Sequence, residues 1–226
     1  MIMKRPYIKI CGVTSPDEAR AAVLAGADLL GLNFHPESVR AVGFHTAKII
    51  KEAALRTFNP KRRGFKPAIV AVFVNPPSEL VEGVIQELKP DLLQFHGDET
   101  PEQCLRYNHP FLKGVRVASH DDITTIPSFI TPKSKTFLID AFNPLSFGGT
   151  GTIVPMELAR RALEMGRGFL AGGLTPANVG QMVETLHPYG VDVASGVEDR
   201  PGNKSDLLMH AFVRAVEEAA ERINAG

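Results

Sequence analysis

Residues 7–26 read YIKICGVTSPDEARAAVLAG, and they contain the strand, loop and helix start that the rest of the chain repeats. The first five residues form a short apolar run that is typical of a buried strand. Ser15 suits the N-cap of a helix, Pro16 its first helical position, and Glu18 the reciprocal position of a capping box. Gly26 favours the end of that helix, because glycine readily adopts the left-handed conformation common there. This stretch therefore predicts one strand–loop–helix unit.

The same unit recurs along the whole chain. Strands are expected at residues 7–11, 28–34, 68–74, 92–95, 112–117, 136–140, 168–171 and 191–194. Helices are expected at residues 16–25, 45–56 and 78–88, after Thr100, after Asp121, at 155–164, from Thr175-Pro176 to Leu186, and at 205–224. Alternating strands and helices indicate a parallel sheet, because each crossover packs a helix on the sheet. Eight such units favour α/β closure into a (β/α)₈ TIM barrel that forms a single domain over residues 1–226.

The composition excludes several classes of partner. Of the 226 residues, 25 are Lys or Arg and 25 are Asp or Glu, so the formal net charge is zero and no nucleic-acid partner is expected. No apolar stretch is long enough to span a membrane, and the first residues lack the apolar core of a secretion signal. The two cysteines, Cys11 and Cys104, do not suggest a disulfide framework, which favours a cytoplasmic location. The basic cluster Lys61-Arg62-Arg63 is expected in a solvated loop at the end of the barrel that supports stability.

In a (β/α)₈ barrel, chemistry is expected from residues at the carboxyl ends of the strands and in the loops that follow them. The reactive and polar residues of this sequence gather at these positions. They are Cys11 after the first predicted strand; Asn33, His35 and Arg40 at and beyond the second; Gln94 and His96 at the fourth; Asp140 at the sixth; Gly172 and Gly173 after the seventh; and Ser195 and Gly196 after the eighth. We therefore predict one site at this end of the barrel.

The loops after the last two predicted strands indicate a phosphate site. Barrels often hold phosphate there, with help from the N-terminus of a short extra helix. Gly172-Gly173 lets backbone N–H groups approach an anion, and Ser195-Gly196 opens a stretch that suits such a helix. Ordinary glycine turns are the alternative for each pair taken alone. Their occurrence in adjacent loops favours a phosphorylated small molecule as the ligand.

Cys11 and Asp140 are the candidates for acid–base chemistry. A free thiol is mostly protonated at neutral pH, so Cys11 needs a cationic neighbour to act as a base. Lys9 lies two residues earlier on the same side of the strand, and Asp192 is the expected partner of its ammonium group in a barrel interior. A small buried hydrophobe is the alternative role for Cys11. Packing does not explain Asp140, a carboxyl group at the end of an apolar run.

Arg40 suits bidentate binding of a carboxylate, with a surface arginine as the alternative. The seven histidines show no metal-ligand spacing, so no metal is expected. No G-x-G-x-x-G follows the first strand and no P-loop is present, so no nucleotide cofactor is expected either.

Six segments together resemble the phosphoribosylanthranilate isomerase family. They are Lys9-Ile10-Cys11-Gly12-Val13-Thr14; Gly26-Ala27-Asp28 with Gly31; Gln94-Phe95-His96-Gly97-Asp98-Glu99; Gly148-Gly149-Thr150-Gly151; Leu170-Ala171-Gly172-Gly173-Leu174 with Pro176 and Asn178-Val179; and Val191-Asp192-Val193-Ala194-Ser195-Gly196-Val197-Glu198. They occur in the order found in the family and run from residue 9 to about Lys204. The resemblance therefore covers nearly the whole chain.

The resemblance implies a barrel of the ribulose-phosphate-binding type and an Amadori rearrangement in tryptophan biosynthesis. N-(5-phosphoribosyl)anthranilate would become 1-(2-carboxyphenylamino)-1-deoxyribulose 5-phosphate. Asp140 would protonate the ribose ring oxygen, Cys11 would remove the C2′ proton, and Arg40 would contact the anthranilate carboxylate. The expected phosphate ligands are Gly172, Gly173, Ser195 and Gly196, and the expected supporting residues are Lys9, Gln94, His96 and Asp192. No cofactor is expected, because the substrate nitrogen serves as the electron sink; the chain is expected to be a monomer or a homodimer.

Two departures from the family pattern stand beside the resemblance. After Gly151 the family often has Phe-Asp-Trp, whereas this chain has Thr152-Ile153-Val154-Pro155. The stretch from Lys51 to Lys66 is longer than usual, but it is expected at the end of the barrel away from the site. The alternative functions are another phosphate-binding barrel enzyme, of the indole-glycerol-phosphate synthase or histidine-pathway isomerase type, and a non-catalytic barrel that binds a phospholigand. The presence of both Cys11 and Asp140 favours the isomerase.

Overall fold

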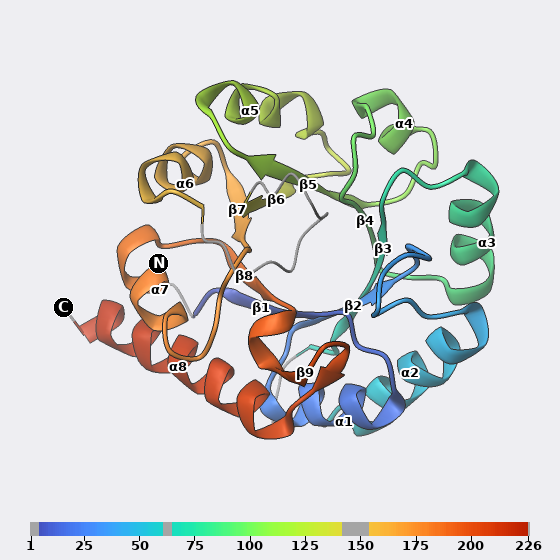
Figure 1. Ribbon diagram of the computed structural model, residues 1–226, viewed down its shortest axis with the longest axis horizontal. Helices are drawn as coiled ribbons and strands as arrows, with labels where there is room; N and C mark the ends of the chain where they lie inside the picture. The colour runs from blue at the N-terminus through green and yellow to red at the C-terminus, as the bar shows by residue number, and fades with distance from the viewer. Residues whose placement is uncertain (1–4, 61–64, 142–153, 226) are drawn as a thin grey trace.

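Eight parallel strands close into a barrel in the structure, a computed structural model that describes residues 5–60, 65–141 and 154–225. The strands follow one another in chain order, and β8 pairs with β1 to close the barrel (Figure 1). They are β1 (Tyr7–Cys11), β2 (Leu29–Asn33), β3 (Ala68–Phe73), β4 (Leu92–Phe95), β5 (Phe111–Val117), β6 (Thr136–Ala141), β7 (Arg167–Leu170) and β8 (Gly190–Val193). The predicted fold class is confirmed, and each predicted strand agrees with an observed one to within one residue at either end.

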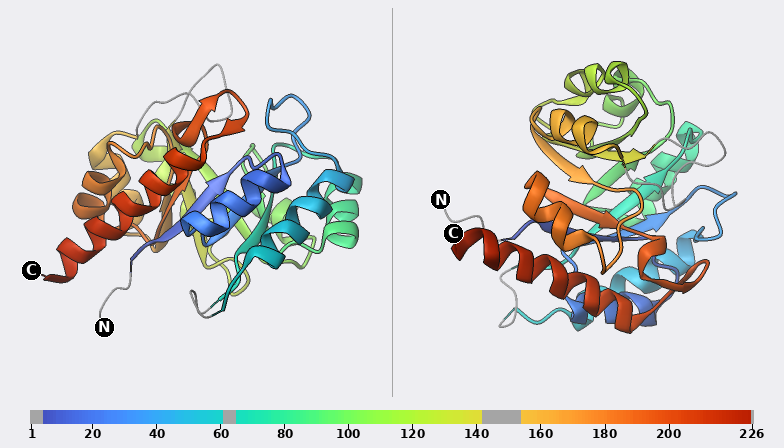
Figure 2. Two further views of the ribbon diagram at one scale, coloured as in Figure 1. Left: turned by 90° about the horizontal axis from the view of Figure 1, so that it is seen from below. Right: turned by 60° about the vertical axis from the view of Figure 1, so that its left-hand side comes forward.

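Helices surround the barrel on the outside (Figure 1). They are α1 (Pro16–Ala25), α2 (Phe44–Thr57), α3 (Ser78–Leu88), α4 (Pro101–Leu105), α5 (His120–Thr124), α6 (Met156–Leu163), α7 (Val179–Leu186) and α8 (Asp206–Ala225), with the 3-10 helices η1 (Ile126–Phe129) and η2 (Ser195–Val197). A hairpin of β9 (Glu198–Arg200) and β10 (Asn203–Lys204), which the sequence did not predict, follows η2. This hairpin lies at one end of the barrel, and α8 runs from there toward the other end (Figure 2).

The start of α1 follows the prediction except in one hydrogen bond. Ser15 accepts a hydrogen bond from the Glu18 N–H at 3.2 Å, and Gly26 ends the helix with a φ of 115°. The predicted capping box is wrong in its second hydrogen bond. The Glu18 carboxylate accepts from the Thr14 N–H, at 2.6 Å, and not from the Ser15 N–H. Its other oxygen accepts from the Lys204 N–H at 2.8 Å. Glu18 therefore ties the loop after β1 to the β9–β10 hairpin.

Helix α7 begins later than predicted. The sequence suggested Thr175 as its N-cap and Pro176 as its first residue, but the helix begins at Val179. Asn178 is the physical reason: its side-chain oxygen accepts from the Thr175 N–H at 2.8 Å, and its amide donates to the Gly173 carbonyl at 2.9 Å. These bonds fold the expected first turn of the helix into a loop.

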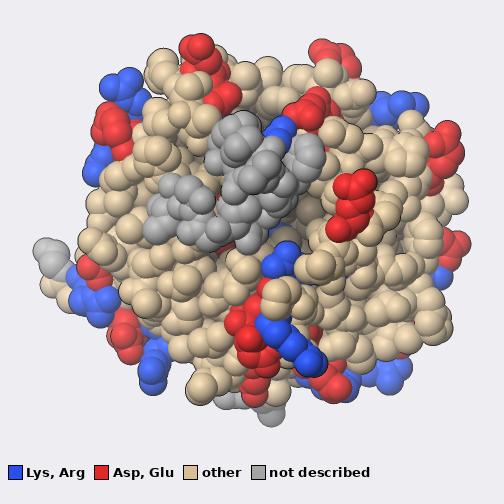
Figure 3. Space-filling view, in the orientation of Figure 1, with Lys and Arg blue, Asp and Glu red and all other residues tan. Residues whose placement is uncertain are grey.

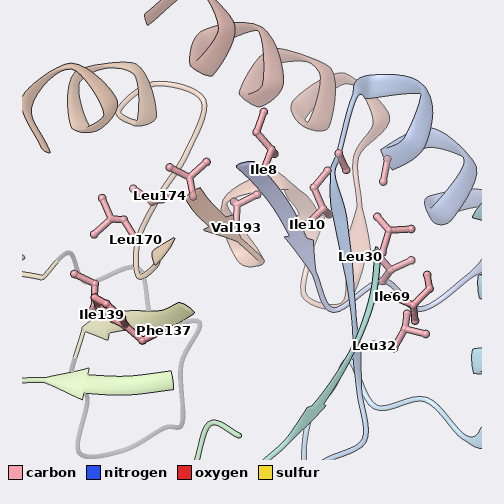
Figure 4. Close-up of a cluster of buried hydrophobic side chains, with 14 of the residues drawn as sticks. Ile8, Ile10, Leu30, Leu32, Ile69, Phe137, Ile139, Leu170, Leu174 and Val193 are labelled. Carbon is pink, nitrogen blue, oxygen red and sulfur yellow. The ribbon is translucent and has the colours of Figure 1, made fainter. Parts of the chain in front are cut away.

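Two apolar layers hold the barrel together. The outer layer lies between strands and helices, and side chains such as Ile8, Leu30 and Leu170 point into it (Figure 4). The inner layer fills the barrel with Leu29, Val70, Val72, Leu112, Leu138, Phe169 and Ala171. Alternate residues of a strand face opposite sides of the sheet, so the inward positions form their own series. Other inward positions in this series hold the buried polar residues Gln94, Asp140 and Asp192.

Some sequence expectations lie outside the described residues. These are the glycine-rich segment 148–151 with the altered residues 152–153, and the basic cluster 61–63. Within the described ranges, no helix is long and apolar enough to cross a membrane. The same ranges contain no group of three or more His, Cys, Asp and Glu side chains placed to hold a metal ion.

Candidate active site

The thiol of Cys11 and the carboxyl group of Asp140 lie at the same end of the barrel. Cys11 is the last residue of β1, and Asp140 is the next-to-last residue of β6. Because all eight strands run parallel, both residues lie on the rim formed by the carboxyl ends of the strands. Two strands, β7 and β8, separate them around the barrel. Cys11 is partly exposed, whereas Asp140 is buried.

The side chain of Lys9 is fully buried inside the barrel, next to Cys11. Its Nζ donates to Asp192 Oδ1 at 2.7 Å, and the two residues are register partners in β1 and β8. Gly31 on β2 leaves the space, because a Cβ there would lie 2.8 Å from Cys11 Sγ and 3.2 Å from Lys9 Nζ. The ion pair expected between Lys9 and Asp192 is therefore present, one inward position below the thiol.

Burial raises the pKa of the Cys11 thiol above its ordinary value. The positive charge of Lys9 acts in the opposite direction, but the negative charge of Asp192 raises the pKa further. Burial disfavours the ammonium form of Lys9, yet the charges and hydrogen bonds of Asp192 and Cys11 together outweigh burial, and the pKa of Lys9 is raised. Lys9 therefore stays charged. Lys204 also lowers the pKa of Cys11, but Lys9 and Lys204 together do not offset its burial, so the thiolate needs additional positive charge nearby.

Three buried side chains form a row of hydrogen bonds on the other side of the rim. Gln94 Nε2 lies 2.9 Å from His96 Nδ1, and His96 Nε2 lies 3.2 Å from Asp140 Oδ2. When the Gln94 amide donates to Nδ1, the ring proton is on Nε2 and is donated to the Asp140 carboxylate. The second carboxylate oxygen, Oδ1, accepts from the Ala141 N–H at 2.8 Å. In this arrangement both oxygens of Asp140 accept a hydrogen bond.

The same row also suits the protonated form of Asp140. Gln94 Oε1 is buried and has no hydrogen-bond partner among the described residues. Half a turn of the amide would present this oxygen to His96 Nδ1, which would then carry the ring proton. His96 Nε2 would accept a hydrogen bond from a protonated Asp140. A glycine at position 114 makes the row possible, because a Cβ on Gly114 would overlap the His96 ring.

Arg40 lies at the mouth of the barrel and forms a bidentate ion pair with Glu198. Arg40 Nε and Nη2 donate to the two oxygens of Glu198 at 2.7 and 2.8 Å. Lys204 Nζ also donates to Glu198, and it donates to the Ala194 carbonyl at 3.2 Å. Figure 3, in the orientation of Figure 1, shows acidic and basic side chains adjoining one another over β9. Arg40 was predicted to bind a carboxylate, and the carboxylate it contacts within the chain is that of Glu198.

The two loops proposed for phosphate lie against each other. Gly172 and Gly173 have positive φ angles of 81° and 62°, which favour glycine. Gly196 packs so closely on the Leu174 carbonyl that a Cβ would overlap it. Ser195 is the first residue of η2, as the sequence suggested for a short helix at this point. The loops after β7 and β8 therefore place these glycines next to each other on the rim that carries Cys11.

Not every polar residue at the rim joins the other side chains. Asn33 donates to Ser38 Oγ at 3.0 Å and accepts from the His35 N–H at 2.8 Å. Asn33 therefore organises the loop after β2 instead of extending toward Cys11. Sequence reasoning missed Glu198 as the partner of Arg40, and Lys204 as a second partner of Glu198. The acidic residue next to the short helix was visible, but no pattern in the sequence connects it to the loop after β2.

Comparison with known proteins identifies the family of the chain. The sequence model of the N-(5′-phosphoribosyl)anthranilate (PRA) isomerase family matches residues 8–215. The chain belongs to the PRA isomerase family. A curated relative, the N-(5′-phosphoribosyl)anthranilate isomerase of Trichlorobacter lovleyi, is 40% identical over 215 residues, which cover 94% of this chain and 98% of the relative.

Solved structures of PRA isomerases have the same fold. Monomers generated from the dimeric enzyme of Thermotoga maritima match with a TM-score of 0.77 and 26% identity, covering 94% of this chain and 99% of that one. A PRA isomerase in complex with reduced 1-(o-carboxyphenylamino)-1-deoxyribulose 5-phosphate matches with a TM-score of 0.77 and 27% identity, with the same coverage. This member of the PRA isomerase family is thus an isomerase, and the family's activity places it in tryptophan biosynthesis.

Proposed function

We propose that Asp140 is the general acid and Cys11 the general base of the PRA isomerase reaction. One observation supports this assignment above all: a thiol and a carboxyl group stand on one rim of the barrel, each with its own set of polar partners. The substrate is N-(5-phosphoribosyl)anthranilate, and the product is 1-(2-carboxyphenylamino)-1-deoxyribulose 5-phosphate.

The reaction proceeds in two proton transfers. Asp140 gives its proton to the ribose ring oxygen; the bond from that oxygen to C1′ breaks, and the substrate nitrogen forms a cationic Schiff base. The Cys11 thiolate then removes the C2′ proton. The electron pair of the C2′–H bond forms a C1′–C2′ double bond, and the electrons of the C=N bond return to nitrogen. The resulting enolamine tautomerises to the ketone.

The order of the two transfers fits the electrostatics of Cys11. Burial raises the pKa of this thiol, so the unliganded protein disfavours the thiolate. The Schiff base produced by the first transfer carries a positive charge beside the thiol, and an opposite charge within a few ångströms favours the ionised form. The acid step therefore prepares the base step. Lys9 supports the thiolate, and Asp192 holds Lys9 in place.

The acid side needs a group that loses and regains a proton. Gln94 and His96 support Asp140 in both states, because reversing the Gln94 amide reverses the direction of the hydrogen bonds. His96 therefore acts on Asp140 and not on the substrate. The proposed role of this pair is to hold the carboxyl group in one orientation throughout the cycle.

The remaining residues bind the two ends of the substrate. The phosphate binds at Gly172, Gly173, Ser195 and Gly196. Positive φ angles at both glycines after β7 and the close packing of the two loops support an anion site there. The anthranilate carboxylate binds Arg40, whose guanidinium group retains donors that Glu198 does not use. The chemistry itself uses no cofactor.

We also propose a domain organisation, a cellular location and an oligomeric state for the chain. The chain acts as one domain over residues 1–226, in the cytoplasm, on a phosphorylated small molecule. Its oligomeric state is a monomer or a homodimer; a dimeric relative in Thermotoga maritima supports the second. Size-exclusion chromatography with light scattering distinguishes the two.

Substitution of Asp140 by Asn tests the acid. General acid catalysts contribute about 10²–10⁴-fold, so kcat for the loss of phosphoribosylanthranilate fluorescence should fall by at least that order. The inhibition constant of the reduced product should change little, because Asn fills the same space. Activity unchanged in Asp140→Asn would remove Asp140 from the mechanism.

Substitution of Cys11 by Ser tests the base in the same assay. The hydroxyl is a far weaker acid than the thiol, so kcat should fall by about 10²–10⁴-fold with folding preserved. Cys104→Ser is the matched control: Cys104 lies in α4, is buried, and its pKa is raised to about 12. A loss in Cys11→Ser that is confined to KM would mean that Cys11 only packs.

A further inference from the structure

We infer that Glu198 orients Arg40 and thereby makes the site select a substrate whose aromatic amine bears a carboxylate. Glu198 is a specificity-determining, positioning residue that does not itself touch the reacting atoms. The inference rests on the proposed role of Arg40 as the partner of the anthranilate carboxylate.

The geometry of the pair determines which edge of the guanidinium group is available. Glu198 occupies the side edge of Arg40, formed by Nε and Nη2, with two bonds of 2.7 and 2.8 Å. A guanidinium group has five N–H donors, so three remain, and two of them lie on its outer edge. A second carboxylate can therefore bind end-on through Nη1 and Nη2. The same Arg40 side chain holds Glu198 on one edge and presents the other edge to a ligand.

Glu198 is itself held firmly. Its side chain is only 4% exposed, and the fully buried Lys204 ammonium group donates to it. The Lys204 backbone N–H donates to Glu18 at 2.8 Å, which links β10 to α1. An anchor of this kind matters because a free arginine side chain samples many rotamers and loses that freedom on binding. Because Glu198 of the β9–β10 hairpin already holds the Arg40 side chain, this loss of rotamer freedom occurs before the ligand binds.

The location of Arg40 connects its outer edge to the reaction. Arg40 runs over Gly12, the residue after Cys11, and a Cβ at Gly12 would overlap the Arg40 side chain. Gly12 has a φ of 73°, which also favours glycine. The arginine therefore passes close above the catalytic thiol, and a carboxylate bound to its outer edge lies at the mouth of the same site.

The charges of the cluster favour one additional anion. Arg40 and Lys204 are cations, Glu198 is an anion, and their sum is +1. Burial would raise the pKa of Glu198, but the hydrogen bonds and charges of Arg40 and Lys204 outweigh burial and lower it. Glu198 therefore remains a carboxylate that neutralises one cation only. Without Lys204, the pair Arg40–Glu198 would be neutral and would attract a second carboxylate less strongly.

The test compares two inhibitors on one set of variants. The first is reduced 1-(o-carboxyphenylamino)-1-deoxyribulose 5-phosphate, and the second is the same compound without the carboxyl group. The measured quantity is the ratio of their inhibition constants. The natural protein should prefer the carboxylated compound by about 10–100-fold, as expected for a bidentate charged contact. A general loosening of the site would weaken both inhibitors and leave the ratio unchanged.

Substitution of Glu198 by Gln should reduce this ratio by about tenfold. The Gln amide offers one acceptor where Arg40 needs two, and its NH₂ group opposes an Arg40 N–H, so the fork turns away. Asp199→Asn is the matched control, because Asp199 is an exposed carboxylate on the same hairpin. It should keep the natural ratio. An unchanged ratio in folded Glu198→Gln overturns the inference.

Substitution of Arg40 by Met separates this inference from the proposed function. If Arg40→Met brings the ratio close to one while Glu198→Gln keeps it, the role of Arg40 stands and that of Glu198 fails. If Arg40→Met keeps the ratio, the proposed carboxylate site itself is wrong.

A further variant covers the case in which Glu198→Gln unfolds because Lys204 loses its charge partner. The double substitution Glu198→Gln with Lys204→Met removes both buried charges. Thermal unfolding followed by circular dichroism verifies its fold. This variant should show the same reduced ratio, and a natural ratio in it would equally overturn the inference.

Discussion

The two sides of the proposed active-site rim surround their reactive side chains with different kinds of groups. On the side of β1 and β8, Cys11 stands above a charged and fully paired couple, Lys9 and Asp192. On the side of β4 and β6, Asp140 lies at the end of a row of hydrogen bonds that runs through the side chains of His96 and Gln94. The first side uses fixed charge, and the second uses hydrogen bonds whose direction can reverse. The difference suggests why the two proton transfers are assigned to different side chains.

Substitutions on the two sides should also differ in how strongly they affect the stability of the protein and its turnover. A buried ion pair destabilises a protein strongly when one partner is removed, because the other charge is left alone in the interior. A row of hydrogen bonds loses less when its geometry shifts. The base side should therefore be sensitive in both stability and activity, whereas the acid side should be sensitive mainly in activity.

Substitution of Lys9 by Met should have the largest effect. It leaves Asp192 buried without its cation, so the free energy of unfolding should fall by about 3–5 kcal/mol in urea titrations. The turnover number should fall as well, since Cys11 loses the positive neighbour that lowers its pKa most. Arg56→Gln is the control, because Arg56 and Glu52 form an exposed pair on α2 that contributes little. A stability loss no larger than that of the control would refute the contrast between the two sides.

Substitution of Gly114 by Ala should come next in size. Its Cβ would overlap the His96 ring and push it from Asp140, and misplacing a catalytic group by about an ångström costs on the order of 10²-fold. We expect kcat to fall by about 10–100-fold, with little change in the inhibition constant of the reduced product. Gly43→Ala is the control, because a Cβ there meets no atom within 4 Å. Equal losses in kcat and inhibitor affinity would indicate a general disturbance instead.

The pH dependence should give the smallest effect and sharpen the comparison. Because burial raises the pKa of Cys11, the thiolate fraction of the free protein increases as pH rises, and the rate of Cys11 alkylation by iodoacetamide should rise by about tenfold per pH unit below that pKa. The rise should end above the ordinary thiol pKa of 9.0. Lys9 lowers the pKa, so Lys9→Met should move the rise to still higher pH, and Cys11→Ser should abolish it. A rise that levels off below pH 9.0 would mean that the charge of Lys9 outweighs burial.

Much of the fold and part of the site were predictable from the sequence, for a local reason. Strand periodicity and the Ser15 and Thr100 caps act within a few residues, so the element order and the strand bounds follow from the chain itself. The parallel barrel also brings the carboxyl end of every strand to one rim, which places Cys11 and Asp140 on the same rim once the order of strands is known. The pairing of Lys9 with Asp192 follows likewise from closure of β8 on β1.

The sequence by itself thus determined the barrel, the rim and the residue types on it. Only the tertiary structure decided the contacts between loops that are far apart in the chain: Glu198 with Arg40, Asn178 with Gly173, and the space that Gly114 leaves for His96. These depend on where a side chain from one loop meets another loop, and no periodicity in the sequence encodes that meeting. The pKa of Cys11 belongs to the same class, because burial by the whole barrel outweighs its charged neighbour in β1.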